Sequence, residues 1–202
     1  MGILSRLMHR ADKDPYWEAF INRPASDSAK TLTHAIRNAP EGRVFPVKSE
    51  VPEPTRMAQD LAELAHFLGA SSMGVAAMDA AYLRLGESDD KQDAPKNLVA
   101  DHPFVVMCAV HAEYDPDVHK GMGGQFAVQE SVSVNFSVSA YIRELGYRAT
   151  VCPVDSLAVA VAAGLGTPGK DGHLVTKEHG SHVYVGDGVL TDLPLALGKP
   201  ER

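Results

Sequence analysis

Five glycines within seventeen residues form the part of this chain best suited to contact a ligand through its backbone. They are Gly164, Gly166, Gly169, Gly172 and Gly180. Glycine tolerates positive φ and lets a bound molecule lie directly on the main chain. The amides of such a loop need hydrogen-bond partners, which a ligand or ordinary turn hydrogen bonds can supply. The spacing alone therefore leaves open a ligand-binding loop and a tight surface connection.

Asp155 is a candidate proton donor just before this segment. A carboxyl group whose pKa is raised by burial keeps its proton at working pH and can donate it to a substrate. Asp155 also precedes an apolar run, Leu157 to Ala163, which predicts a short helix that Gly164 ends in a left-handed cap. Aspartate is a favoured N-cap, and its charge suits the helix dipole. We favour the capping role, with which proton donation is compatible.

Three histidines stand among the glycines or just after them. They are His173, His179 and His182. Imidazole can bind metals or transfer protons near neutral pH. No cysteine or carboxylate stands at a recognisable ligand spacing from them, so we predict no metal ligand and place these histidines at a pocket edge or on the surface.

The two cysteines, Cys108 and Cys152, form no Cys-x-x-Cys motif. We predict buried free thiols, because disulfides are rare in a reducing compartment and free cysteine behaves as a small apolar side chain. Iron–sulfur clusters need a full set of cysteine ligands. We therefore expect no such cluster in this chain.

The composition indicates one domain. A chain of 202 residues with 45% hydrophobic content can bury one substantial core. Lysine and arginine total 19 against 26 aspartate and glutamate, and this net charge of -7 disfavours nucleic-acid binding. No apolar run reaches transmembrane length, and the N-terminus lacks a signal-peptide core. We therefore expect a cytoplasmic protein without membrane contact.

Hydrophobic periodicity predicts the helices. Apolar residues recur at helical spacing over 55–68, and Gly69 ends that run. Residues 132–138 alternate as a strand would, yet a helical stripe also runs from Val134 to Leu145. We predict a helix there, because the stripe persists to Gly146, a natural C-cap.

Short apolar runs predict the strands over 72–78, 104–112, 147–152 and 183–190. Residues 113–125 contain Pro116 and three glycines, which predicts a loop long enough to border a pocket. The charged segment 87–96 predicts a solvated loop.

Interleaved helices and strands without a repeated dinucleotide-binding unit predict an α+β domain with α/β layering. A proline-marked boundary at Val51–Pro54 separates an N-terminal extension, residues 1–50, from the domain, residues 51–202. Within the extension, Trp17, Phe20 and Ile21 are the expected anchors.

The sequence of the C-terminal segment resembles that of the cobalamin-binding domain of reductive dehalogenases and epoxyqueuosine reductases. The matching residues are Ala163 to Gly166, Gly169, Lys170, Gly172, Leu174, Val175, Gly180 and Thr191 to Leu195. Upstream, residues 141–149 match the family's helix-to-strand corner and residues 68–75 resemble its Leu-Gly-Ala element. The resemblance therefore spans roughly residues 55–195.

This resemblance implies a nitroreductase-like sheet flanked by helices and a cobalamin bound base-off, without a lower ligand from the protein. It implies contacts to the corrin rim or nucleotide tail from Gly164, Leu165, Gly166, Gly169, Lys170, Gly172, His173 and Leu174. Lys170 would be available to a phosphate, and Asp155 matches an aspartate implicated as proton donor above the corrin. Electrons would come from a separate ferredoxin or flavoprotein.

Departures from the family pattern bear on the reaction. Val128 stands where reductive dehalogenases place a catalytic tyrosine, and residues 180–185 lack the family's arginine. His119 nearly completes the Asp-x-His-x-x-Gly motif of Rossmann-type cobalamin proteins, but Met122 stands where the motif needs glycine. The proton donor and anion stabiliser of dehalogenation are therefore not evident.

Three functions follow as hypotheses. The chain would be a cobalamin carrier or sensor, which the missing polar residues favour, or a cobalamin-dependent reductase subunit such as a reductive dehalogenase. The third hypothesis is a flavin-binding, nitroreductase-like protein. The sequence leaves the substrate and the formation of a homodimer open.

Overall fold

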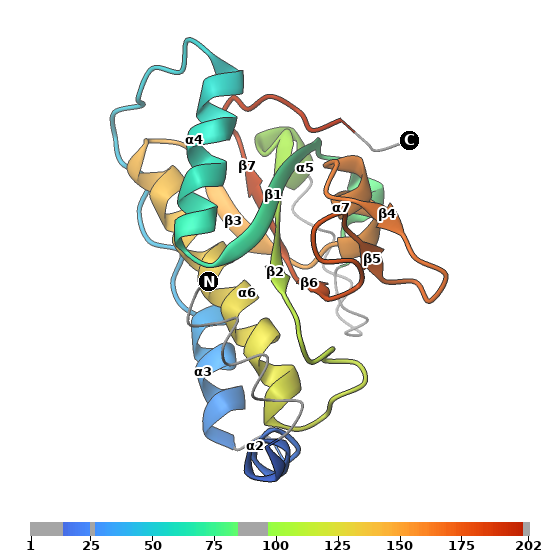
Figure 1. Ribbon diagram of the computed structural model, residues 1–202. Helices are drawn as coiled ribbons and strands as arrows, with labels where there is room; N and C mark the ends of the chain where they lie inside the picture. Colours follow the sequence, from blue (N-terminus) through green and yellow to red (C-terminus); the bar gives the residue numbers. More distant parts are fainter. Residues whose placement is uncertain (1–13, 25–26, 85–96, 200–202) are drawn as a thin grey trace.

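The computed structural model describes residues 14–24, 27–84 and 97–199, whose helices surround a central sheet (Figure 1). The helices are α2 (Pro15–Ile21), α3 (Asp27–Arg37), α4 (Pro54–Phe67), α5 (Leu98–Asp101), α6 (Met122–Glu144) and α7 (Ser156–Ala162), with a 3-10 turn η1 (Ala80–Tyr82). The strands are β1 (Ala70–Ala77), β2 (Phe104–His111), β3 (Ala149–Cys152), β4 (Thr167–Pro168), β5 (Leu174–Val175), β6 (Val183–Val185) and β7 (Gly188–Thr191). The predicted α+β class is confirmed.

The central sheet is antiparallel throughout, with the order β1-β2-β7-β3 and with β6 paired to the far end of β2. Strand β2 is buried from Val105 to Val110, as its apolar run predicts. Alternate side chains of a strand face opposite sides of the sheet. Val106, Cys108 and Val110 accordingly pack in the cluster that α4 and α6 cover, whereas Val105 and Met107 pack on the side of α7. The sheet is thus the middle layer between helices.

Helix α6 resolves the strand-or-helix ambiguity in favour of the helix. Val134, Val138 and Ile142 lie on its buried face, and its serine hydroxyls donate to carbonyls of the preceding turn. Gly146 follows the helix with a φ of 84°, as predicted for a C-cap. The helix begins at Met122, however, so the predicted loop over 113–125 is too long at its C-terminal end.

The single strand predicted over 183–190 is wrong, because the chain forms two strands there. Strand β6 pairs with the end of β2, and β7 pairs with its beginning. Gly186 and Asp187 interrupt the run, and the carbonyl of Asp187 accepts a hydrogen bond of 2.8 Å from Nδ2 of Asn135 on α6. This side-chain partner lies far away in the sequence, so periodicity could not reveal the break.

The described part of residues 1–50 packs against α6 through α2 and α3. Ile21 is buried, whereas Phe20 is 40% exposed. The predicted solvated loop at 87–96 lies outside the described residues. Among the described helices, none is both long and apolar enough to cross a membrane.

Candidate functional site

The glycine segment connects α7 to β6 by way of the small ribbon formed by β4 and β5. Gly164 has a φ of 79°, which confirms the predicted left-handed end of α7. The amides of Gly164 and Leu165 donate to carbonyls of α7, and those of Gly169 and Gly172 donate within the loop. Turn hydrogen bonds therefore satisfy these four amides.

Close packing of the backbone explains two of the glycines. A Cβ at Gly164 would lie 2.5 Å from the carbonyl oxygen of Lys199, and one at Gly166 would lie 2.2 Å from that of Val175. A Cβ at Gly172, in contrast, would meet nothing within 4 Å. The two positions therefore need glycine for packing whether or not a ligand binds.

The remaining residues of the predicted cofactor-binding set differ in how accessible they are. Leu174 is 3% exposed and packs with Ala160 and Val183, and Leu165 is partly buried beside them. Lys170 and Gly172 are exposed, and His173 is partly exposed. The part of the set that can reach a ligand directly is therefore centred on residues 170–173.

Asp155 caps helix α7, as predicted. Its Oδ1 accepts a hydrogen bond of 3.1 Å from the amide of Ala158, and its Oδ2 forms an ion pair with Arg84. Its own amide donates to the carbonyl of Tyr82. Both carboxylate oxygens are thus engaged in structural contacts. Proton donation by Asp155 stays a prediction.

A pocket of about 680 Å³ lies between the N-terminal half of α6, the end of β2 and the turn before β6. We call it the main pocket. Trp17 from α2, Phe126 and Glu130 from α6, and Tyr114 from the loop after β2 contribute to its lining. The prediction that this loop borders a pocket is confirmed. Small-molecule sites typically measure roughly 300–1,000 Å³, so the volume suits such a ligand.

Three aromatic side chains, those of Trp17, Tyr114 and Phe126, line the main pocket. The Nε1–H group of Trp17 donates to the hydroxyl of Tyr114 over 2.9 Å, and the Trp17 ring stacks on Phe20 with centroids 5.6 Å apart. Phe126 is 41% exposed. Because aromatic rings pack favourably on one another, these side chains suit a flat, largely apolar ligand.

Two side chains of the main pocket, those of His111 and Glu130, have shifted proton affinities. The rings of His111 and His179 meet edge to face, with centroids 5.2 Å apart. Burial, then the charges of His179 and His182, lower the pKa of His111. Partial burial of its carboxyl at the pocket's edge raises the pKa of Glu130, although the side chain keeps contact with solvent. Neutral imidazole and protonated carboxyl are thus both favoured here.

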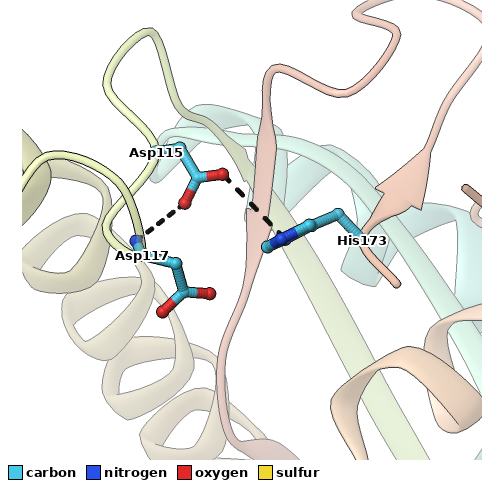
Figure 2. A group of neighbouring side chains, drawn as sticks. All are labelled: Asp115, Asp117 and His173. Carbon is cyan, nitrogen blue, oxygen red and sulfur yellow. Dashed lines mark hydrogen bonds and ion pairs between the residues drawn. The ribbon is translucent and has the colours of Figure 1, made fainter. Parts of the chain in front are cut away.

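A second, smaller hollow of about 190 Å³ lies next to the main pocket, and Ala112 and Glu113 line both. We call it the Asp115 hollow. Figure 2 shows Asp115, Asp117 and His173 around a common space. The Oδ1 atom of Asp115 accepts a 2.7 Å hydrogen bond from the amide of Asp117, and its Oδ2 lies 4.0 Å from Nδ1 of His173.

These three side chains offer ligand atoms within 4.8 Å of one another, close enough to hold a metal ion. Carboxylate oxygens and imidazole nitrogens are ordinary ligands of divalent metals. Sequence spacing does not reveal this group, because the two aspartates follow β2 whereas His173 precedes β5. Of the predicted site residues, the tertiary fold therefore brings His173 to a set of carboxylates.

Both cysteines are buried and free, as predicted. Burial raises the pKa of the Cys108 thiol to about 12. Burial, followed by the charges of Asp187 and Glu41, also raises the pKa of Cys152. Neither thiol is therefore a reactive thiolate at neutral pH.

The chain is similar to known proteins in sequence and in structure. No protein-family profile matches the sequence. A segment of 72 residues, 34% of this chain, is 39% identical to a tetrachloroethene reductive dehalogenase of Desulfitobacterium hafniense and spans 13% of that protein. A tetrachloroethene reductive dehalogenase of Dehalobacter restrictus matches to the same extent.

Among solved structures, the catabolic reductive dehalogenase NpRdhA is similar with a TM-score of 0.68 and 23% identity. The match covers 89% of this chain and 27% of that one. Epoxyqueuosine reductase from Streptococcus thermophilus is similar with a TM-score of 0.54 and 16% identity, over 73% of this chain and 49% of that one. The chain therefore has the fold found in reductive dehalogenases and, over 72 residues, is related to them in sequence as its motifs predict.

Proposed function

We propose that this chain is a cobalamin-binding reductase domain of the reductive-dehalogenase type, which receives electrons from a separate ferredoxin or flavoprotein. The observation that carries the proposal is the 39% identity over 72 residues to tetrachloroethene reductive dehalogenase. The fold match over 89% of the chain supports it. The chain spans only about a quarter of that dehalogenase structure, and the substrate is accordingly open.

The residues present suit such a cofactor in two ways. The main pocket has aromatic side chains that suit a flat molecule, and Ala112 and Glu113 line both this pocket and the Asp115 hollow. The exposed residues Lys170 and Gly172 stand on either side of Asp171, which lines that hollow together with His173. We assign the flat ring system to the junction where Ala112 and Glu113 line both spaces, which leaves the aromatic end of the main pocket for a substrate. We assign Lys170 to a phosphate of the nucleotide tail.

When bound, cobalamin supplies the reducing cobalt centre. The protein's own residues have other tasks. Trp17 and Phe126 would pack against a flat substrate and exclude water, and Asp155 would hold the start of α7 in place through its cap. Binding without a lower ligand from the protein stays part of this proposal.

The test is the absorption spectrum of the protein incubated with hydroxocobalamin, with flavin mononucleotide as the competing cofactor. We expect corrin bands that shift toward the base-off form, together with quenching of the fluorescence of Trp17, which is the chain's single tryptophan. Flavin binding without a corrin shift would instead support a nitroreductase-like function.

A pair of variants sharpens this test. Lys170→Ala should weaken cobalamin binding by at least about tenfold, because a charge-assisted hydrogen bond contributes about 1.5–3 kcal/mol. The matched control is Lys199→Ala, which removes another exposed lysine. Equal affinities for the two variants would contradict the assignment of Lys170 to the phosphate.

Val128 favours a second candidate, because it stands where the resembled dehalogenases have a catalytic tyrosine. A carrier or sensor would bind cobalamin without turnover. An assay with titanium(III) citrate as reductant and a halogenated phenol as substrate separates the two. A reductase should release halide faster than the same concentration of free cobalamin, whereas a carrier or sensor should not.

A further inference from the structure

Glu130 occupies a distinctive position in the main pocket. It projects from α6 beside Gly69, where the chain between α4 and β1 approaches the helix. A Cβ at Gly69 would lie 2.6 Å from Oε1 of Glu130, so the absence of a side chain at residue 69 makes room for the carboxyl. The carboxyl therefore has a defined place at the pocket's edge.

The titratable groups that share the lining come from four other parts of the chain. They are His66 from α4, His111 from β2, Glu113 and Tyr114 from the following loop, and His179 from the turn before β6. Burial raises the pKa of Glu130 and lowers that of His111. At the same pH, Glu130 therefore keeps its proton more readily than an ordinary glutamate, while His111 tends to be neutral.

The aromatic side chains of the pocket define what would lie near this carboxyl. Trp17 and Tyr114 are held by their mutual hydrogen bond, and Phe126 precedes Glu130 by one turn of α6. Residues four apart on a helix project from the same face. A flat molecule packed on Phe126 would thus lie beside the carboxyl of Glu130.

We propose that Glu130 is the catalytic proton donor to a small aromatic electrophile bound among Trp17, Tyr114 and Phe126. This inference rests on the proposed reductase function. In the reaction, the bond from carbon to halogen breaks and the halide leaves with its electron pair. A low-potential one-electron donor protein supplies two electrons in succession, and Glu130 supplies the proton of the new C–H bond. The carboxylate then regains a proton from solvent, to which Glu130 is exposed.

The first test uses the protein without cofactor. The side-chain carboxyl carbons of glutamate are labelled with carbon-13 and followed by NMR against pH, and the Glu130 resonance is assigned by its absence from Glu130→Gln. We expect it to titrate above the other glutamates and to shift on addition of para-bromophenol, which should also quench the fluorescence of Trp17. If the chemical shift of the Glu130 resonance does not change when para-bromophenol is added, the placement of the ligand is wrong.

The second test uses the cobalamin-loaded protein with titanium(III) citrate as reductant. Glu130→Gln should bind cobalamin and para-bromophenol as the wild type does, yet release bromide roughly 100-fold more slowly, the usual contribution of a general acid. Its rate should also lose the decline that the wild type shows as the pH rises through the pKa of Glu130. The matched control is Glu144→Gln, an exposed glutamate at the far end of the same helix.

The outcomes separate the two proposals. Wild-type protein that binds no cobalamin would contradict the proposed function and, with it, the reduction step. Wild-type protein that releases bromide while Glu130→Gln keeps its rate and pH profile would overturn the role of Glu130 alone.

Discussion

The main pocket and the Asp115 hollow adjoin each other, yet they are built differently. Helices α2 and α6 and strand β2 supply much of the main pocket, and these elements are held by buried side chains. The Asp115 hollow is lined almost wholly by loop residues after β2, before β5 and before β6. Burial thus shifts proton affinities in the main pocket, whereas the smaller hollow gathers charged groups near solvent. Proton transfer suits the first region, and contact with charged ligand groups suits the second.

The largest expected effect on stability concerns Gly124, where helix α6 packs against the loop after β2. Gly124→Ala would place a Cβ 1.9 Å from the carbonyl oxygen of His119, in the loop that carries Asp115 and Asp117. The overpacking should lower the free energy of unfolding by about 3 kcal/mol, as measured by urea denaturation. Gly172→Ala is the control, since its Cβ would meet nothing and only its φ of 83° opposes the change. That left-handed conformation should lower the stability by about 1 kcal/mol. Equal losses would contradict this account of Gly124.

A smaller effect tests whether the aromatic ligand belongs to the main pocket. Phe126→Ala should weaken the affinity for para-bromophenol about fivefold, because an aromatic pair contributes about 1 kcal/mol. The quenching of Trp17 fluorescence measures this affinity. Val118→Ala removes a 72% exposed side chain that lines the Asp115 hollow and should leave the affinity unchanged. A larger loss with Val118→Ala would place the ligand in the smaller hollow.

The lowered pKa of His111 predicts a dependence of stability on pH. Below the ordinary histidine pKa of 6.5, the unfolded chain takes up a proton that folded His111 resists. The wild type should therefore lose stability as the pH falls below that value. His111→Gln should lose less between about pH 7.5 and about pH 5.5, as measured by urea denaturation. His34→Gln, on the exposed surface of α3, should behave as the wild type does. A steeper loss in His111→Gln would refute this sign.

The smallest expected change is in thiol reactivity. Cys108 is buried and its pKa is raised to about 12, so iodoacetamide should not modify it in the native protein near neutral pH. Denaturation should expose it to rapid alkylation, which mass spectrometry of peptides measures. Rapid labelling of Cys108 in the native state would show that the centre of the sheet opens readily.

Local sequence signals predicted most of the domain's scaffold. The apolar run of β2, the helical stripe of α6 and the caps at Gly146 and Gly164 each depend on residues near one another in the chain. The division of 183–190 into β6 and β7 involves Asn135, and the helices α2 and α3 pack against α6. Such distant partners explain why the strand break and the N-terminal helices escaped prediction.

The candidate site divides in the same way. The sequence by itself determined the N-cap at Asp155, the buried cysteines and the family motifs of the glycine segment, because each depends on residue type and short spacing. Only the tertiary structure decided that Trp17, Tyr114 and Glu130 share one pocket and that Asp115 meets His173. The physical reason is that helix packing and strand pairing bring these side chains together from segments far apart in the chain, and burial in that packing alters the proton affinity of Glu130.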